Sequence, residues 1–166
     1  MNPTELISPA MRRKGMGAVM RGASLVTRLL PFPQPTLMVG PGSSARLGES
    51  VAGMGHRKIL IVTDAIIVKL GLTQALMQAL EAGGVEYVVF DKITPDAPIP
   101  LIEEGLEFFK NHDCDAIVAF GGGSSMDAAK VIAVAANNPN PLRQLAGYFK
   151  GRHSPVPIYA VPTTAG

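Results

Sequence analysis

Residues 115–136 read DAIVAFGGGSSMDAAKVIAVAA, an apolar run followed by a glycine turn and a second, longer apolar stretch. The first run, 115–120, is short and bounded by charge and glycine, which is typical of a buried parallel strand. The stretch from about 125 to 136 is long enough for a helix, and it begins with residues that favour a helix start. We therefore expect a strand, a tight turn and a helix in succession.

Strand and helix patterns alternate along the rest of the chain as well. Further strands are expected at 36–39, 58–63, 87–90 and 157–161, and further helices at 43–52, 65–82 and 101–111. This spacing predicts an α/β fold, with a mostly parallel sheet and helices on both faces. In such folds ligands bind at the carboxyl ends of the strands.

Composition excludes several classes of protein. The 166 residues are 47% hydrophobic and 17% charged, which is unlike a disordered chain. The single cysteine, Cys114, excludes an intrachain disulfide. The net charge of +2 does not indicate a nucleic-acid partner, and no apolar run approaches the roughly 20 residues of a membrane span. We expect a cytoplasmic protein without a membrane partner.

Residues 1–30 differ from the remainder and form a candidate N-terminal extension. They hold five basic side chains against the single acidic Glu5, and their apolar positions share one side of a helical wheel. This amphipathic helix could be a surface or subunit contact, a mitochondrial-type presequence or a membrane-surface helix. Three prolines between 31 and 35 end it, so we place the α/β domain at 31–166.

The glycine turn is the main candidate binding site. Gly121, Gly122 and Gly123 lack Cβ atoms, so their N–H groups can lie against a ligand, and the following helix directs its positive end to the same place. Ser124 as the N-cap, with Asp127 three residues later, resembles a capping box. The turn suits phosphate or pyrophosphate, although similar turns occur in α/β domains that bind no nucleotide. It matches neither the Walker A loop nor the usual G-x-G-x-x-G fingerprint.

Asp64 provides a second candidate. It follows the run KILIVT at 58–63, so it lies at the carboxyl end of a predicted strand. A carboxylate there can accept two hydrogen bonds from a ribose diol and would repel a 2′-phosphate. Asp64 can equally serve as the cap of the next helix, and the sequence leaves both interpretations open.

Three ordered motifs together carry a family resemblance. They are VTD at 62–64, GGGSSMDAAK at 121–130 and PTTAG at 162–166. With them, residues 30–166 resemble the N-terminal cofactor-binding domain of the iron-containing (group III) alcohol dehydrogenases. The resemblance implies a Rossmann-like, dehydroquinate-synthase-like domain. Glycerol dehydrogenases share the broader fold, so a polyol dehydrogenase is an alternative.

The resemblance also assigns roles to individual residues. Residues 121–124 would hold the pyrophosphate of NAD, and Asp64 would bind the adenosine ribose and favour NAD over NADP. Thr163 and Thr164 would contact the cofactor near the middle of the cleft, and Asp127 would line the pocket on the nicotinamide side. Asp96 stands where the family commonly has an Asn near the adenosine, so that contact departs from the family pattern.

The family's divalent metal, iron or zinc, is held by one Asp and three His of a second, helical domain. His56, His112 and His153 are scattered here and show no metal spacing, so we assign no metal ligand and no catalytic residue within 1–166. The resemblance implies hydride transfer between NAD and a small alcohol or aldehyde in a longer, homo-oligomeric enzyme, with 1–166 alone inactive. A non-catalytic dinucleotide-binding module and a purely structural α/β piece are the competing hypotheses.

Overall fold

The structure is a computed structural model that describes residues 36–145 and 153–164. Four strands form one sheet in the order β2-β1-β3-β4, and every neighbouring pair is parallel. The strands are β1 (Lys58–Val62), β2 (Glu86–Phe90), β3 (Ala116–Gly121) and β4 (Ile158–Pro162). This arrangement confirms the predicted α/β fold with a parallel sheet.

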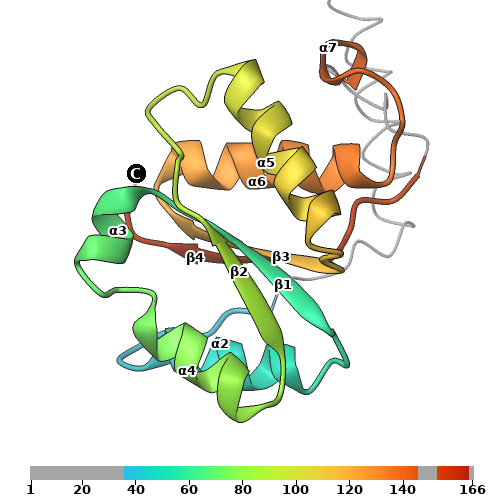
Figure 1. Cartoon of the computed structure of the whole chain (residues 1–166). Coiled ribbons are helices and arrows are strands. Elements are labelled where there is room, and N and C mark those ends of the chain that lie inside the picture. Colours follow the sequence, from blue (N-terminus) through green and yellow to red (C-terminus); the bar gives the residue numbers. More distant parts are fainter. Residues whose placement is uncertain (1–35, 146–152, 165–166) are drawn as a thin grey trace, which may run out of the picture. The chain divides into compact units, whose positions relative to one another are not determined.

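Helices cover both faces of the sheet (Figure 1). Helices α5 (Ile99–Asn111) and α6 (Gly123–Ala136) lie on one face, and α2 (Ser43–Ala52) and α4 (Gln74–Ala82) on the other. Successive residues of β1 alternate between the two cores because strand side chains point to opposite faces. Leu60 and Val62 join the α5/α6 core, while Ile59 and Ile61 join the core that includes Leu76 and Leu80 of α4.

Register places the carboxyl ends of the strands together. Val62, the last residue of β1, pairs with Phe90 of β2 and with Ala119 of β3. Gly121, the last residue of β3, pairs with Pro162 of β4. The segments that follow the four strands therefore leave the sheet at the same edge, where the glycine turn and Asp64 are found.

Two predicted elements were wrong. Residues 36–39 form no strand, and Leu37 and Val39 are more than 80% exposed, because no described strand takes up their backbone hydrogen bonds. The predicted helix 65–82 is two helices, α3 (Ala65–Lys69) and α4, interrupted at Gly71 with φ +71°. The glycine turn consequently follows the third described strand rather than a fourth.

Other differences are small. A short helix, α7 (Leu142–Leu145), lies in a segment predicted as loop. α5 begins two residues before its predicted start, with Pro100 in its first turn, where a missing N–H is tolerated. The predicted helix in 1–30 and the domain boundary at 30/31 lie outside the described residues. None of the described helices combines the length and apolar composition that a bilayer crossing requires.

Candidate cofactor-binding site

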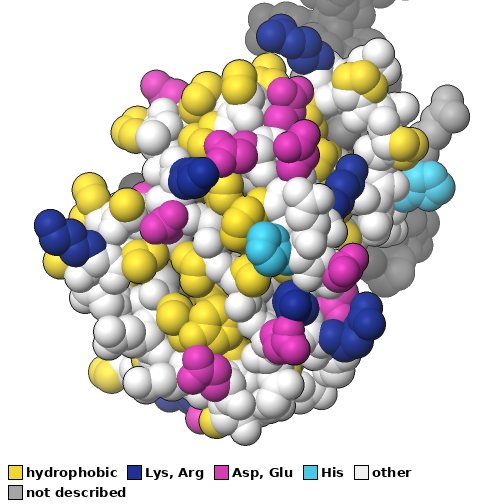
Figure 2. Space-filling view, in the orientation of Figure 1, with side chains coloured by type: hydrophobic (Ala, Val, Ile, Leu, Met, Phe, Trp, Pro, Cys, Tyr) yellow, Lys and Arg dark blue, Asp and Glu magenta, His cyan; other side chains and the backbone are white. Residues whose placement is uncertain are grey.

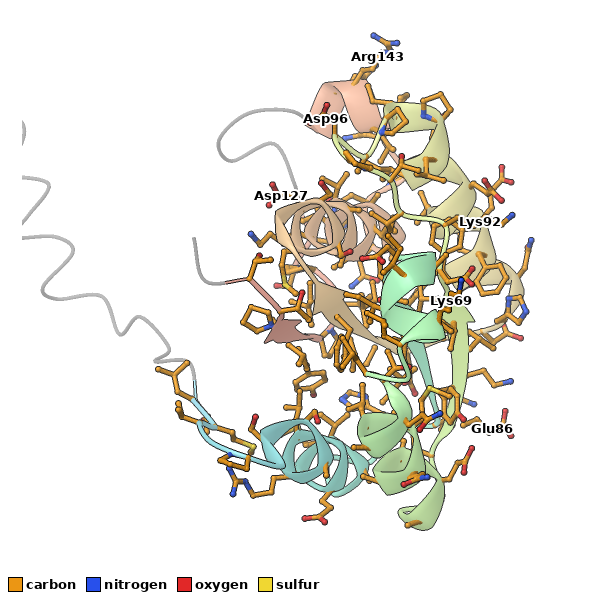
Figure 3. All side chains as sticks on the ribbon, turned by 90° about the vertical axis from the view of Figure 1, so that its left-hand side faces the viewer. Lys69, Glu86, Lys92, Asp96, Asp127 and Arg143 are labelled. Carbon is orange, nitrogen blue, oxygen red and sulfur yellow. The ribbon has the colours of Figure 1, made fainter. Side chains whose placement is uncertain are left out.

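A cleft of about 700 Å³ lies at the carboxyl edge of the sheet. Its walls come from the four segments that leave the strands, namely residues 64–67, 91–95, 122–125 and 163–164. In Figure 3 this edge faces the viewer, with α3 near the centre and the first turn of α6 beside it. Segments distant in sequence thus converge where a parallel sheet is expected to bind ligands.

Gly121 is required by the protein's own packing. Its φ is +149°, a conformation that residues with side chains rarely adopt. A Cβ at this position would lie 2.6 Å from Ser125 Oγ, closer than any real contact of that kind. Gly121 is buried and does not line the cleft, so its role is to turn the chain from β3 toward α6.

Gly122 and Gly123 line the cleft, and the chain's own packing does not explain them. Gly122 is extended, with φ −83°, and a Cβ there would meet Thr164 Oγ1 at an ordinary 3.5 Å. Gly123 is the first residue of α6, and a Cβ there would meet nothing within 4 Å. The missing side chains instead leave bare backbone facing the cleft, which allows close approach of a ligand.

The N-terminus of α6 has no side-chain cap. Its N-cap is Gly122, and no acidic residue occupies the first turn. The predicted cap at Ser124 was therefore wrong, and α6 begins two residues earlier than expected. Asp127 does not form a capping box either, because it is the fifth residue of α6 rather than the third, and its Oδ1 accepts from Lys130 Nζ at 3.1 Å. No side chain of the described residues caps the first amides of this 14-residue helix, and a helix dipole makes such a position favourable for an anion.

Asp64 caps α3, as one of its two interpretations predicted. Its Oδ1 accepts hydrogen bonds of 3.0 Å from the backbone N–H groups of Ile66 and Ile67. These bonds fix the carboxylate at the cleft wall. They use one oxygen, and Oδ2 has no hydrogen-bond partner within the described part of the chain. Capping and ligand binding by Asp64 are therefore compatible.

The remaining candidates divide into two groups. Thr163 and Thr164 line the cleft, and the Thr163 N–H donates to the Gly121 carbonyl at 3.0 Å, which ties the end of β4 to the glycine turn. Asp96 and Asp127 do not line it. Figure 3 shows Asp127 on the opposite side of the view from Lys92, which does line the cleft.

The family model for iron-containing alcohol dehydrogenases matches residues 34–166. The chain belongs to this family. The resemblance inferred from the three motifs is thereby confirmed. The matched range contains the VTD strand end, the glycine turn and the PTTAG segment.

Individual relatives support the assignment to the iron-containing alcohol dehydrogenases. Choline dehydrogenase of Bacillus subtilis (strain 168) is 39% identical over 139 residues, covering 81% of this chain and 35% of that protein. The NAD-dependent methanol dehydrogenase of Bacillus methanolicus is 35% identical, with 81% and 35% covered. A crystal structure of sulfoacetaldehyde reductase from Bifidobacterium kashiwanohense in complex with NAD+ superposes with a TM-score of 0.69 at 30% identity, covering 81% of this chain and 36% of that one. The chain thus spans about a third of the length of these relatives.

In this family member, one wall of the cleft was not predicted from sequence. Residues 91–95 follow β2 and are tied to the end of β1, where Thr63 N–H donates to Phe90 O at 3.0 Å and Ile93 N–H donates to Thr63 O at 3.2 Å. Asp64 and Lys92 form an isolated antiparallel bridge. The rule that pointed to Asp64, a polar residue directly after a parallel strand, would also have identified Asp91, with Lys92 as the next residue.

Lys92 is the single basic residue among those that line the cleft in the described part of the chain. Its Nζ donates to Glu104 Oε1 of α5, and this hydrogen bond raises the pKa of the ammonium group. The side chains of Lys92 and Glu104 are 60% and 47% exposed, so the pair is a surface ion pair of modest strength.

A metal centre does not fit the described residues. Within 36–145 and 153–164, no group of three or more His, Cys, Asp or Glu side chains converges on a point where a metal could bind. His56 instead contacts Tyr159 and Asp115, and His112 Nδ1 lies 2.8 Å from the Phe108 carbonyl. His153 is exposed.

Proposed function

We propose that this chain is the cofactor-binding part of an NAD-dependent alcohol dehydrogenase acting on a small alcohol or aldehyde. Family membership supports an oxidoreductase, and two of the similar proteins carry NAD in their names or complexes. The observation that carries the cofactor assignment is the pair Gly122 and Gly123. Both face a cleft with room for side chains that the sequence does not supply.

The pyrophosphate of NAD would bind at the start of α6. The first-turn N–H groups would donate to its oxygens, and the helix dipole would stabilise their negative charge. A pyrophosphate needs close contact with the main chain, and side chains at 122 and 123 would prevent it. Thr163 and Thr164, which line the cleft from the end of β4, would contact the cofactor farther along.

Asp64 would orient the adenosine ribose. Oδ1 is held by two amides of α3, so the carboxylate is fixed in place and Oδ2 is available to accept from a ribose hydroxyl. A phosphate in place of the 2′-hydroxyl would put two negative groups together, which favours NAD over NADP. Asp96 and Asp127 lie outside the cleft lining, and we assign them no contact.

When bound, NAD supplies the hydride acceptor, and the residues of this chain bind and orient it. The described residues do not fit a metal site, so we propose that the divalent metal of the family is held by parts of the enzyme that this chain does not span. On this proposal residues 1–166 contribute cofactor affinity and selectivity, and the chain alone has no dehydrogenase activity.

The test uses Gly123→Val with Ser43→Val as its matched control. Each of these two positions is the first residue of a helix that has glycine as its N-cap. Of the two, only position 123 lines the cleft. Calorimetric titration with NAD should show at least about tenfold weaker binding for Gly123→Val, because the loss of even one charge-assisted hydrogen bond has that effect. Ser43→Val should bind like the wild type. Unchanged affinity in Gly123→Val would contradict the proposal.

A further inference from the structure

Lys92 lies next to the residue proposed to meet the adenosine ribose. The bridge between Asp64 and Lys92 makes them direct backbone neighbours, and both line the cleft. A free lysine at this place would attract the 2′-phosphate of NADP, since ammonium groups are common phosphate ligands. Its presence therefore opposes the selectivity expected from Asp64.

Glu104 removes this conflict. Its carboxylate accepts a hydrogen bond from the Lys92 ammonium across the gap between α5 and the segment after β2. The ion pair offsets part of the positive charge and holds the ammonium group toward α5. Among the described residues that line the cleft, Asp64 and Asp91 are then the charged groups that no salt bridge neutralises, and Asp64 keeps Oδ2 free at the proposed ribose position.

We propose that Glu104 is a positioning residue for cofactor choice, which holds Lys92 back from a 2′-phosphate and so enforces selectivity for NAD. This inference rests on the proposed function, because it assumes that the adenosine ribose lies at Asp64. Glu104 does not line the cleft and acts through Lys92.

The neighbouring carboxylates of α5 provide a control. Acidic side chains gather over this helix in Figure 2, and the helix carries Glu103, Glu104 and Glu107, all exposed. Within the described residues only Glu104 pairs with Lys92. Glu103→Gln changes the net charge by the same amount as Glu104→Gln without releasing the lysine, so comparing the two variants separates the ion pair from the general field of α5.

The experiment measures dissociation constants for NAD and NADP by calorimetry on the 166-residue chain. Glu104→Gln should shift the ratio toward NADP by about threefold, the scale of a surface ion pair, while Glu103→Gln leaves it unchanged. In an Asp64→Asn background, which keeps an oxygen to cap α3 but removes the repulsion, the shift caused by Glu104→Gln should grow to about tenfold. Adding Lys92→Gln to Glu104→Gln should abolish the shift in the NAD/NADP ratio in both backgrounds.

The outcomes separate this inference from the proposed function. One outcome is that the wild type binds NAD, Gly123→Val prevents this binding, and Glu104→Gln leaves the ratio of the NAD and NADP dissociation constants unchanged in both backgrounds. That result overturns the role of Glu104 and leaves the proposed function standing. An equal shift in Glu103→Gln, or a shift that survives Lys92→Gln, also overturns it. If the wild-type chain binds neither dinucleotide, both proposals fail together.

Discussion

The two edges of the parallel sheet differ in how far their polar groups are paired. At the amino edge, side chains bond to one another: His56 Nε2 lies 2.7 Å from Tyr159 Oη, which donates to Met54 Sδ at 3.0 Å. The His56 ring also lies 3.5 Å from Asp115 Oδ1, and the other oxygen of Asp115 accepts from the Arg57 N–H at 2.9 Å. At the carboxyl edge, the start of α6 has neither a side-chain cap nor side chains on its two cleft glycines.

This difference supports our proposal that the carboxyl edge binds the ligand. Most of these amino-edge groups bond to one another and so stabilise the fold, although Asp115 Oδ1 is buried without a hydrogen-bond partner among the described residues. The amino edge also holds the free cysteine, Cys114, whose pKa is raised to about 11 mainly by burial, so the thiol stays protonated and unreactive at neutral pH. Bare helix amides gain their partners from a ligand, as we propose for the carboxyl edge.

The sharpest contrast is between glycines within one turn. Gly121→Ala should lower the free energy of unfolding by about 3 kcal/mol, because a Cβ would force an unfavourable φ and clash with Ser125. Gly123→Ala, whose Cβ meets nothing within 4 Å, should change stability by less than about 0.5 kcal/mol. Urea unfolding of both variants measures this. Equal losses of stability in the two variants would contradict the division of the turn into a glycine needed for folding and a glycine that faces the cleft.

The amino edge should matter for stability and not for binding. His56→Ala removes the hydrogen bond to Tyr159 and the contact with Asp115, and should destabilise the chain by about 1–2 kcal/mol. Tyr159→Phe removes only the hydroxyl and should lose about 1 kcal/mol. NAD affinity should be unchanged in both. A weakened affinity with the fold intact would mean that the two edges are coupled.

The smallest effect concerns Thr63, at the end of β1. Its side chain is fully buried, and Oγ1 has no hydrogen-bond partner among the described residues. Thr63→Val keeps the shape and removes an unsatisfied hydroxyl, so stability should stay the same or rise by about 1 kcal/mol. The midpoint temperatures of thermal unfolding of Thr63→Val and of the wild type measure this change. A clear loss of stability would contradict this prediction and show that the Thr63 hydroxyl has a hydrogen-bond partner in solution.

Much of the fold was predictable because each core strand has its own local signal. KILIVT and DAIVAF are β-branched or apolar runs flanked by charge and glycine, and both are central strands with every residue of β3 buried. Residues 36–39 carry a similar apolar signal but form no strand, because a strand depends on a neighbour that periodicity does not reveal. The break at Gly71 was missed because a single glycine inside a helical pattern is often tolerated.

The candidate site was predictable where the backbone dictates it. The glycine turn and Asp64 could be found from their positions after strands. That Gly121 serves the fold while Gly122 and Gly123 face the cleft follows only from three-dimensional packing. The Lys92–Glu104 pair joins residues 12 apart on different elements, and no sequence rule predicts such a contact.

A crystal structure of the chain soaked with NAD tests the central claim most directly. We predict density for the pyrophosphate against the main-chain N–H groups at the start of α6, with a ribose hydroxyl on Asp64. Dinucleotide bound elsewhere, with the space beside Gly122 and Gly123 empty, would contradict it.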